Sequence, residues 1–373
     1  MQHVGDDRPV LDPIHHETVC EWTPGNSRHD HQFIFELSDD QLLLVWCEYY
    51  ADAPSYLDRD PTDELGQIRD HMPCRISGKL SADRGRTWSD SFVLQENRWE
   101  GNVKHPNLVR FSPEELLFTF VGWESETRRD VFMKRSEDNG ESWGPIEQIS
   151  SPGWYCNNAG HALQLESGRV LLPAHSPGGG SEFETLGPGI DEVGSENLYS
   201  FVYYTDDRGD TWQTSEDAMT VPGRGAHEPS IVELEDGRLL CLLRNSQERI
   251  YKAYSEDEGV HWSDPVPTEL PAPESPSIVR RIPTTGDLLL LWNHVASDSN
   301  WPRRPLSAAI STDEGESWGS FADVDARPDH DAAYADVAFV DGEALVTYYS
   351  SPDHWARDAE VTLKIFSIDQ FYN

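Results

Sequence analysis

The sequence predicts an all-β protein, a six-bladed β-propeller whose blades are four-stranded antiparallel sheets. An eight-residue pattern, Ser/Thr-x-Asp-x-Gly-x-x-Trp, recurs five times, and we call each copy an Asp-box. The copies begin 50 to 69 residues apart, which is the spacing of a repeat architecture. Between them, short apolar runs are separated by turn residues, and no run has a convincing helical period.

Each Asp-box is typical of the tip of a β-hairpin. Its Asp carboxylate can accept hydrogen bonds from turn N–H groups, and its Gly supplies a positive φ. Its Trp then returns to the hydrophobic layer. The boxes are SADRGRTW, SEDNGESW, TDDRGDTW, SEDEGVHW and STDEGESW, which begin at Ser81, Ser136, Thr205, Ser255 and Ser311.

The unit around the fourth Asp-box shows the expected blade most clearly. Residues 229–234, 238–244 and 249–255 are its first three strands, and residues 262–268 follow the box as an outer strand. The same frame recurs in residues 32–46, 106–120, 162–174, 277–292 and 335–349, which makes six blades.

The chain ends complete the expected ring. Residues 361–368 are the third strand of the sixth blade, which has no Asp-box, and residues 17–22 supply its outer strand. We therefore expect residues 1–373 to form a single propeller domain.

The charge of the chain is strongly acidic and evenly spread. It has 67 Asp and Glu against 29 Lys and Arg, a formal net charge of −38. Such a surface disfavours nucleic acid, because neutralising phosphates requires a basic face. Self-repulsion becomes tolerable where the Debye length is short, roughly 3 Å at about 1 M salt. We therefore expect a halophilic protein of a high-salt cytoplasm.

Cysteine usage and the N-terminal residues indicate a soluble protein without structural metal. The five Cys are scattered with no CxxC pair, which supports neither a disulfide framework nor a zinc ribbon. The opening MQHVGDDRPV has no apolar core or twin Arg, and no run of 18 apolar residues occurs. We expect a cytoplasmic monomer with no membrane or nucleic-acid partner.

The propeller frame sorts residues onto two rims. The Asp-boxes join third to fourth strands and therefore share one rim. The starts of first strands and the ends of second strands lie on the opposite rim, around a central mouth. Two long loops, residues 51–73 and 176–197, also open there. Long loops in compact repeats are commonly functional, so we expect the substrate at this box-free rim.

Four residues on the box-free rim form a chemically coherent set. Glu228 opens the first strand of blade four and Arg244 ends its second strand. Arg303, with Arg304 beside it, opens the third strand of blade five, and Tyr334 opens the first strand of blade six. Guanidinium groups bind carboxylates bidentately, so the set suits an anionic ligand.

At these residues the chain resembles the sialidase (neuraminidase) superfamily of Asp-box propellers. The resemblance is most specific in HEPSIVELEDGRLLCLLRNS, RRPLSAAIS and AYADV. It implies an exo-glycoside hydrolase for a sialic-acid-like or uronic sugar, with Tyr334 as nucleophile and Glu228 as its activating partner. It also implies that Arg244 and Arg303 grip the substrate carboxylate. A phenol has a pKa of about 10 and needs a neighbouring base to attack at neutral pH.

The chain also departs from the family pattern in blade one. The family carries a third Arg in a Phe-Arg-Ile-Pro motif, where this chain has RHDHQFIFEL, with His31 near that place and Arg28 as the nearby Arg. The resemblance further implies an Asp acid in the loop that follows. That loop offers Asp52, Asp58, Asp60 and Asp63, and the sequence does not choose among them.

Four histidines fall at or next to the start of an inner strand, and we expect them at the substrate with Asn293. They are His31, His105, His161 and His227. The favoured interpretation is that they bond backbone or line a sugar pocket, so no cofactor is expected. With Glu228 they also have the donor types for a divalent metal such as zinc or manganese.

Two other functions stay open from the sequence. The histidines could instead act as acid and base, with Tyr334, in a polysaccharide lyase or metal-assisted hydrolase on uronic-acid glycans. A non-catalytic propeller that binds a glycan or a protein is the third alternative. In each case the expected partner is a small molecule or glycan, or a protein for the third alternative.

Overall fold

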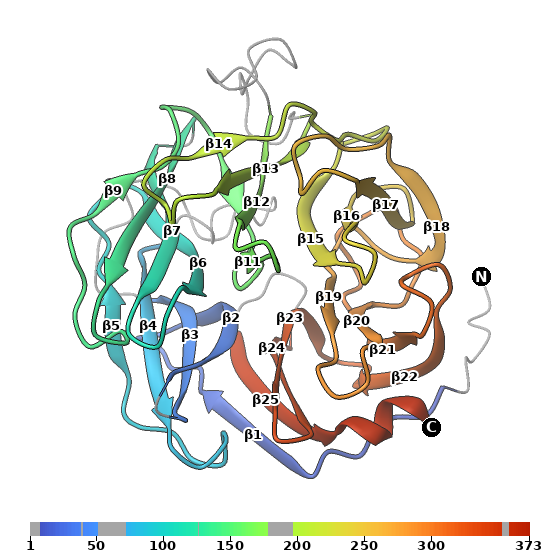
Figure 1. Cartoon of the computed structure of the whole chain (residues 1–373). Coiled ribbons are helices and arrows are strands. Elements are labelled where there is room, and N and C mark those ends of the chain that lie inside the picture. The colour runs from blue at the N-terminus through green and yellow to red at the C-terminus, as the bar shows by residue number, and fades with distance from the viewer. Residues whose placement is uncertain (1–7, 39, 51–71, 126, 178–196, 353–357) are drawn as a thin grey trace.

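Six β-sheets are arranged around a central axis in the computed structural model of the chain (Figure 1). The structure describes residues 8–38, 40–50, 72–125, 127–177, 197–352 and 358–373. The predicted all-β, six-bladed propeller is confirmed, and every strand pairing within its blades is antiparallel. Within the described residues, no helix is long and apolar enough to cross a membrane.

The first three blades follow one another along the chain. Blade one is β2 (Arg28–Glu36), β3 (Leu42–Tyr49), β4 (Cys74–Ser81) and β5 (Phe92–Gln95). Blade two is β6 (Asn102–Arg110), β7 (Leu116–Ser125), β8 (Arg128–Ser136) and β9 (Glu147–Gln148). Blade three is β10 (Cys156–Asn157), β11 (Leu163–Gln164), β12 (Val170–Ser176), β13 (Tyr199–Thr205) and β14 (Gln213–Thr214).

The remaining blades close the ring. Blade four is β15 (His227–Glu233), β16 (Leu239–Arg244), β17 (Arg249–Ser255) and β18 (Val266–Pro271). Blade five is β19 (Ile278–Arg281), β20 (Leu288–Asn293), β21 (Leu306–Ser311) and β22 (Gly319–Asp325). Blade six is β23 (Asp331–Val340), β24 (Glu343–Ser351), β25 (Glu360–Ser367) and β1 (His15–Cys20).

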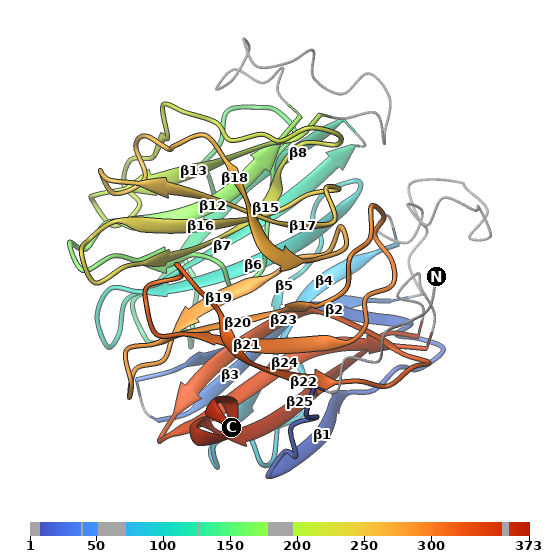
Figure 2. The ribbon, with the colours of Figure 1, turned by 90° about the vertical axis from the view of Figure 1, so that its right-hand side faces the viewer.

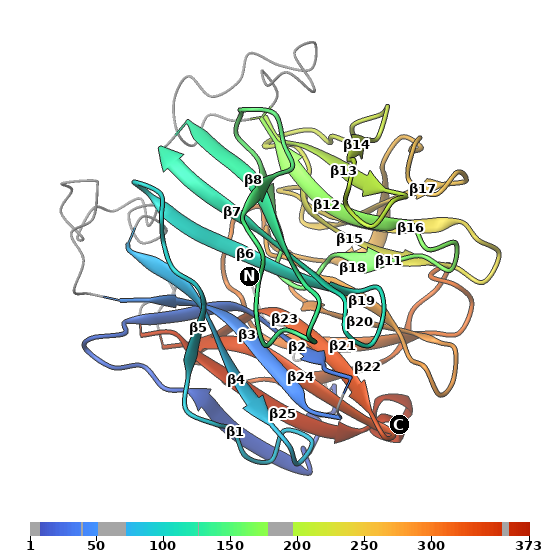
Figure 3. The same ribbon diagram turned by 60° about the vertical axis from the view of Figure 1, so that its left-hand side comes forward.

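Blade six joins the two ends of the chain, as the sequence predicted. β1 pairs antiparallel with β25, with Glu17 opposite Leu363 (Figure 3). A short 3₁₀ helix, η2 (Ile368–Tyr372), follows β25 and packs beside β21 and β22 of blade five (Figure 2). Sequence periodicity did not predict this helix, because five residues are too few to show a period.

The Asp-boxes have the predicted hairpin geometry and lie between third and fourth strands. In the first box, Thr87 N–H donates to Asp83 Oδ1 over 2.8 Å, and Gly85 N–H donates to Ser81 Oγ over 2.8 Å. Gly85 has φ +80°, and Trp88 packs against the hydrophobic core between blades six and one. The other four boxes repeat these bonds.

The hydrophobic cores lie between adjacent blades rather than inside single sheets. Phe33 and Val45 of blade one, for example, share a buried cluster with Leu108 and Phe118 of blade two. Each blade is therefore stabilised by apolar burial against its neighbours, which is why the ring must close to complete the core.

Blade three differs from the expected four-strand frame. Its inner strand is split into β10 and β11, which both pair with β12. The break includes Gly160, whose φ is +73° and where an added Cβ would lie 2.8 Å from Phe33 Cβ of blade one. A side chain would not fit at this crowded position, and the positive φ also favours glycine, so the break requires a glycine at residue 160.

Candidate active site

Four inner strands carry the same β-bulge near the box-free rim. The bulged residues His31, His105, Glu228 and Tyr334 have φ values of +51°, +58°, +48° and +51°. In each strand the pairing register shifts across this residue. Non-glycine residues rarely adopt positive φ, and bulges re-aim side chains next to active sites. The repeated bulge therefore marks the positions from which the fold presents side chains to the mouth.

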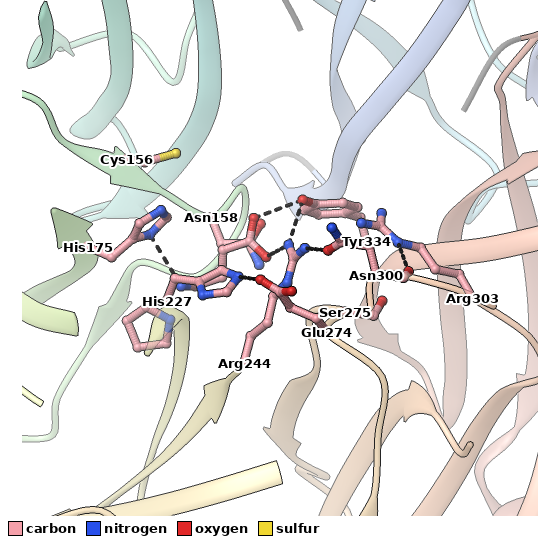
Figure 4. A network of polar contacts seen from close by, with 12 residues as sticks. Cys156, Asn158, His175, His227, Arg244, Glu274, Ser275, Asn300, Arg303 and Tyr334 are labelled. Carbon is pink, nitrogen blue, oxygen red and sulfur yellow. Dashed lines mark hydrogen bonds and ion pairs between the residues drawn. The ribbon is translucent and has the colours of Figure 1, made fainter. Parts of the chain in front are cut away.

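Tyr334, Glu228 and Arg244 meet at this mouth. The Tyr334 hydroxyl donates to Glu228 Oε1 over 2.8 Å, and Arg244 Nη1 donates to Tyr334 Oη over 3.1 Å. Arg244 Nη1, which points toward Tyr334 in Figure 4, also forms an ion pair with Glu228 Oε2. The three residues come from blades six and four, so the structure brings together the pair and one Arg that the sequence singled out.

The Glu228 carboxylate is ionised although it is buried. Burial alone would raise its pKa, but the Arg244 guanidinium beside it lowers the pKa to about 2. Burial opposes the Arg244 charge too, yet the pKa of Arg244 is raised because Glu228 lies against it. A permanent proton acceptor is thus held against the phenol of Tyr334.

Arg303 supplies a second buried cation at the mouth. It lies in the segment before β21, where its Nε donates to Asn300 O over 3.2 Å and its Nη1 to Tyr349 Oη over 3.0 Å. Its guanidinium carbon lies 5.4 Å from the Tyr334 ring centre. Across the described parts of the chain, no carboxylate forms an ion pair with this side chain, which is 8% exposed. The charge of Arg303 is therefore available to an anion.

Arg304 and Asn293 lie beside the mouth but are bonded to the protein. Arg304 Nη1 pairs with Asp331 Oδ1 at 2.9 Å. Asn293 Nδ2 donates to Ala332 O over 2.9 Å, and its Oδ1 accepts from Ser275. These contacts hold the segment before β21 and the start of β23. The substrate-binding role of both residues stays a prediction.

The four sequence-predicted histidines are all buried, but they do not share one environment. The His31 ring lies 4.5 Å from that of His105 and 4.3 Å from that of Tyr334. His105 Nε2 lies 3.1 Å from Cys156 Sγ. The structure therefore places His31 against both His105 and Tyr334.

His161 and His227 have separate partners. His161 Nδ1 lies 3.1 Å from Pro229 O, and His227 Nε2 lies 3.4 Å from Glu274 Oε1. Burial lowers the pKa of His161 to about 3, and it lowers the pKa of His227 and His105 well below the usual value. These three rings are neutral near pH 7.

Potential metal ligands come close together at one place in the described residues. There, ligand atoms of Asp30, His31 and Cys47 lie within 4.8 Å of one another. Asp30 already accepts from Arg28 Nε over 2.6 Å and contacts His31 Nδ1 at 2.7 Å. A carboxylate neutralised by Arg has little charge left for a cation, and this group contains one of the four predicted histidines. The expectation of no cofactor stays a prediction, and a metal at the histidines stays an open alternative to it.

Several residues at the mouth were missed from the sequence. His175 Nδ1 accepts from Glu228 N–H over 3.2 Å, and Asn300 Oδ1 accepts from Arg244 Nη2 over 2.7 Å. His175 and Tyr349 lie near the ends of the second strands of their blades, as Arg244 does. The rule that second strands end at this rim would have found both. Asn300 lies between strands, where no periodic signal exists.

The predicted acid residues cannot be placed by this geometry. Asp52 and Asp58, with Asp60 and Asp63, lie in residues 51–71, outside the described residues. Much of the second long loop, residues 178–196, lies outside them too. The assignment of the acid stays a prediction.

The fold and its mouth define an Asp-box propeller with a tyrosine, a carboxylate and two arginines at the box-free rim. Two solved structures share this fold. A Trypanosoma rangeli sialidase in complex with 2,3-difluorosialic acid matches with a TM-score of 0.71 and 13% identity, over 96% of this chain and 60% of that one. A Dyadobacter fermentans protein of unknown function matches with a TM-score of 0.69 and 16% identity, over 95% of this chain and 99% of that one. At these identities the likeness concerns the fold.

Sequence comparison gives the family. A family model described as a BNR repeat-like domain matches residues 66–346. A sialidase of Clostridium perfringens is 26% identical over 220 residues, which cover 52% of this chain and 53% of the relative. A sialidase of Paraclostridium sordellii is 25% identical over 220 residues. The chain belongs to the BNR repeat-like family of the sialidase superfamily, and it spans about half the length of the curated relatives it matches.

Proposed function

We propose that this protein is an exo-glycoside hydrolase of the sialidase type, which removes a carboxylate-bearing sugar from a glycan. The observation that carries the proposal is the 2.8 Å hydrogen bond from the Tyr334 hydroxyl to the ionised, buried Glu228. Beside it lies Arg303, a buried cation without a carboxylate partner in the described structure. A nucleophile, its base and an anion site thus share one mouth.

The proposed reaction begins with attack by Tyr334. Its Oη bonds to the anomeric carbon while its proton passes to Glu228, and the glycosidic C–O bond breaks. A neutral phenol suits a sugar whose anomeric carbon bears a carboxylate, because a carboxylate nucleophile would be repelled. Water then cleaves the Tyr–sugar bond, and the Tyr334 oxygen takes its proton back from Glu228. A separate acid–base residue gives the leaving oxygen a proton in the first step and recovers one from this water in the second.

Arg244 and Arg303 are proposed to hold the substrate carboxylate. In the ligand-free protein the charge of Arg244 is compensated by Glu228. Once Glu228 has accepted the tyrosine proton, that compensation is lost and Arg244 can pair fully with the substrate. Arg244 would therefore pair first with the catalytic base, Glu228, and later with the substrate carboxylate.

The test is a screen of aryl glycosides of sialic and uronic acids at multimolar salt, the medium that the net charge of −38 favours. Tyr334→Phe should abolish turnover while retaining sugar binding by calorimetry. Tyr254→Phe is the matched control, since it removes a hydroxyl beside the fourth Asp-box on the opposite rim. Full activity of Tyr334→Phe would contradict the mechanism.

The same screen decides between the open alternatives. An unsaturated product that absorbs in the ultraviolet would identify a lyase, and loss of turnover with a chelator would identify a metal-assisted enzyme. Binding without turnover of any glycan would leave a binding propeller. We further propose that the protein is a halophilic, cytoplasmic monomer whose partner is a glycan, which sedimentation at high salt and cell fractionation would test.

A further inference from the structure

We propose that His31, oriented by Asp30, is a proton-transfer residue of this site that serves the leaving oxygen and the attacking water. The inference rests on the proposed hydrolase function and adds a residue pair to it. It places an imidazole where only a loop carboxyl was expected to act.

Asp30 fixes the His31 ring in one orientation. His31 Nδ1 lies 2.7 Å from Asp30 Oδ1, and the other Asp30 oxygen accepts from Arg28 Nε over 2.6 Å. Asp30 is fully buried, and Arg28 and His31 together hold the pKa of its carboxyl well below the usual range in spite of burial. An ionised Asp30 accepts a hydrogen bond from Nδ1–H, which leaves Nε2 as the nitrogen that can gain or lose a proton.

The Nε2 atom of His31 is an unsatisfied polar atom in a buried position. The side chain is 3% exposed, and Nε2 has no hydrogen-bond partner anywhere in the described structure. A buried nitrogen without a hydrogen bond has lost its contact with water and gained none in return, which is unfavourable. A ligand oxygen or the reacting water would satisfy it.

His31 also lies against the reacting tyrosine. Its ring centre is 4.3 Å from that of Tyr334, and Gln32 Nε2 donates to Tyr334 O over 2.6 Å. The bulges of blades one and six are thereby fastened together. Both bulged residues have φ +51°, so the same backbone device presents both side chains to the mouth.

The other predicted histidines lack this arrangement. His105 Nε2 faces Cys156 Sγ, and His161 Nδ1 faces a backbone carbonyl. His227 Nε2 lies 3.4 Å from Glu274 Oε1, but neither ring nitrogen of His227 forms a hydrogen bond in the described structure. Among the four histidines, His31 alone combines a hydrogen bond from one ring nitrogen to a buried carboxylate with an unbonded second nitrogen in the described residues.

Charged and titratable groups from several blades surround His31. On its own strand lie Asp30 and Arg28, from β6 come Lys104 and His105, and from β3 comes Cys47. Tyr334 of β23 packs against it, and Glu228 of β15 and His161 also act on it electrostatically.

Every proton that is transferred in the two steps has a donor and an acceptor. In the first, the Tyr334 proton goes to Glu228 and the leaving oxygen takes the Nε2 proton of charged His31. In the second, water gives its proton to neutral His31 as it bonds to the anomeric carbon, and the Tyr334 oxygen recovers its own from Glu228. The sum is hydrolysis with His31 regenerated.

The experiment compares two leaving groups in His31→Asn and Asp30→Asn. Asn tolerates the positive φ of position 31 better than most residues, and circular dichroism checks that each variant folds. We expect kcat/KM on an alkyl sialoside or uronide to fall by about 10²- to 10⁴-fold, with a much smaller loss on a nitrophenyl glycoside, whose leaving group needs no proton. The control is His29→Gln in the same strand, whose ring accepts from Trp46 Nε1.

Each outcome decides one point. Equal losses on both leaving groups, with the wild-type pH profile kept, would overturn the assignment of His31 while leaving the hydrolase intact. No turnover of any glycoside by the wild-type protein would instead refute the proposed function. In that case ¹⁵N NMR of labelled histidine still tests the pairing of His31 with Asp30. A signal from an Nδ1–H tautomer that titrates at Nε2 and disappears in His31→Asn supports the pairing. An Nε2–H tautomer at His31 overturns it.

Discussion

The Tyr334 hydroxyl donates a 2.8 Å hydrogen bond to Glu228, although the two residues lie 106 positions apart in different blades. Both occupy the bulge of an inner strand, with φ values of +51° and +48°. The contact therefore depends on two equivalent backbone distortions that face each other only when the ring has closed. It gives the mouth its most reactive pair of groups.

Replacing Glu228 by Gln should remove the base without removing bulk. We expect kcat to fall by about 10²- to 10⁴-fold, since a neutral amide cannot take the tyrosine proton. Because the pKa of Glu228 is lowered to about 2, the wild-type residue stays ionised throughout the usual assay range. Any acid limb above pH 4 in the kcat/KM profile should then come from another group.

The alkaline limb of the kcat/KM profile has its own check. His31 must carry its proton when the leaving oxygen departs, so the alkaline limb seen with the alkyl glycoside should be absent in His31→Asn, which a pH series would show. An alkaline limb that persists in His31→Asn would assign it to another group.

Arg303→Gln should weaken binding of an anionic sugar specifically. A charged hydrogen bond is worth about 1.5–3 kcal/mol, which corresponds to a roughly 10- to 100-fold rise in Kd. Calorimetry with the free acid and with its methyl ester gives the readout, because the ester lacks the charge and should bind both proteins similarly. If Arg304→Gln instead shows the larger loss of affinity for the free acid relative to the ester, Arg304 binds the substrate carboxylate and Arg303 does not. In the structure the Arg304 guanidinium pairs with Asp331.

The buried histidines should make the fold sensitive to acid. Burial lowers the pKa of His161 and of His175 to about 3, whereas the unfolded value is about 6.5. The folded state is favoured above pH 6.5, and the benefit is lost as pH falls toward 3, since the unfolded chain then binds protons that the folded one excludes. The free energy of unfolding should drop by about 1.4 kcal/mol per pH unit for each ring.

Urea unfolding at fixed salt across this pH range measures the slope. His161→Gln should reduce it, and His330→Gln, at a partly exposed position, should leave it unchanged. Equal slopes in all three proteins would show that the rings are not the cause.

The Asp-boxes should contribute to stability and not to turnover. Asp83→Ala removes the acceptor for Thr87 N–H and Arg86 N–H at 2.8 and 3.1 Å, so we expect a loss of about 1–2 kcal/mol in the free energy of unfolding. Asp90→Ala, just beyond the same box, is the control. A change in kcat/KM in folded Asp83→Ala would contradict the separation of the two rims.

The sequence determined the architecture because the signals for it are local. The Asp-box spacing, the apolar runs and the closing strand at residues 17–22 are each readable within a few residues, and together they placed Glu228, Arg244 and Tyr334 on one rim. The position of a residue along a strand predicts the rim on which it lies. It does not predict which side chain the residue contacts.

Only the tertiary structure decided which side chains meet. The bond between Tyr334 and Glu228, the lack of a described carboxylate partner for Arg303 and the contact of Asp30 with an otherwise unbonded His31 depend on bulges and on neighbouring blades. The need for glycine at residue 160 likewise follows from the closeness of Phe33 of another blade. These contacts join residues far apart in the chain, and they exist only after the ring has closed, so no local pattern records them.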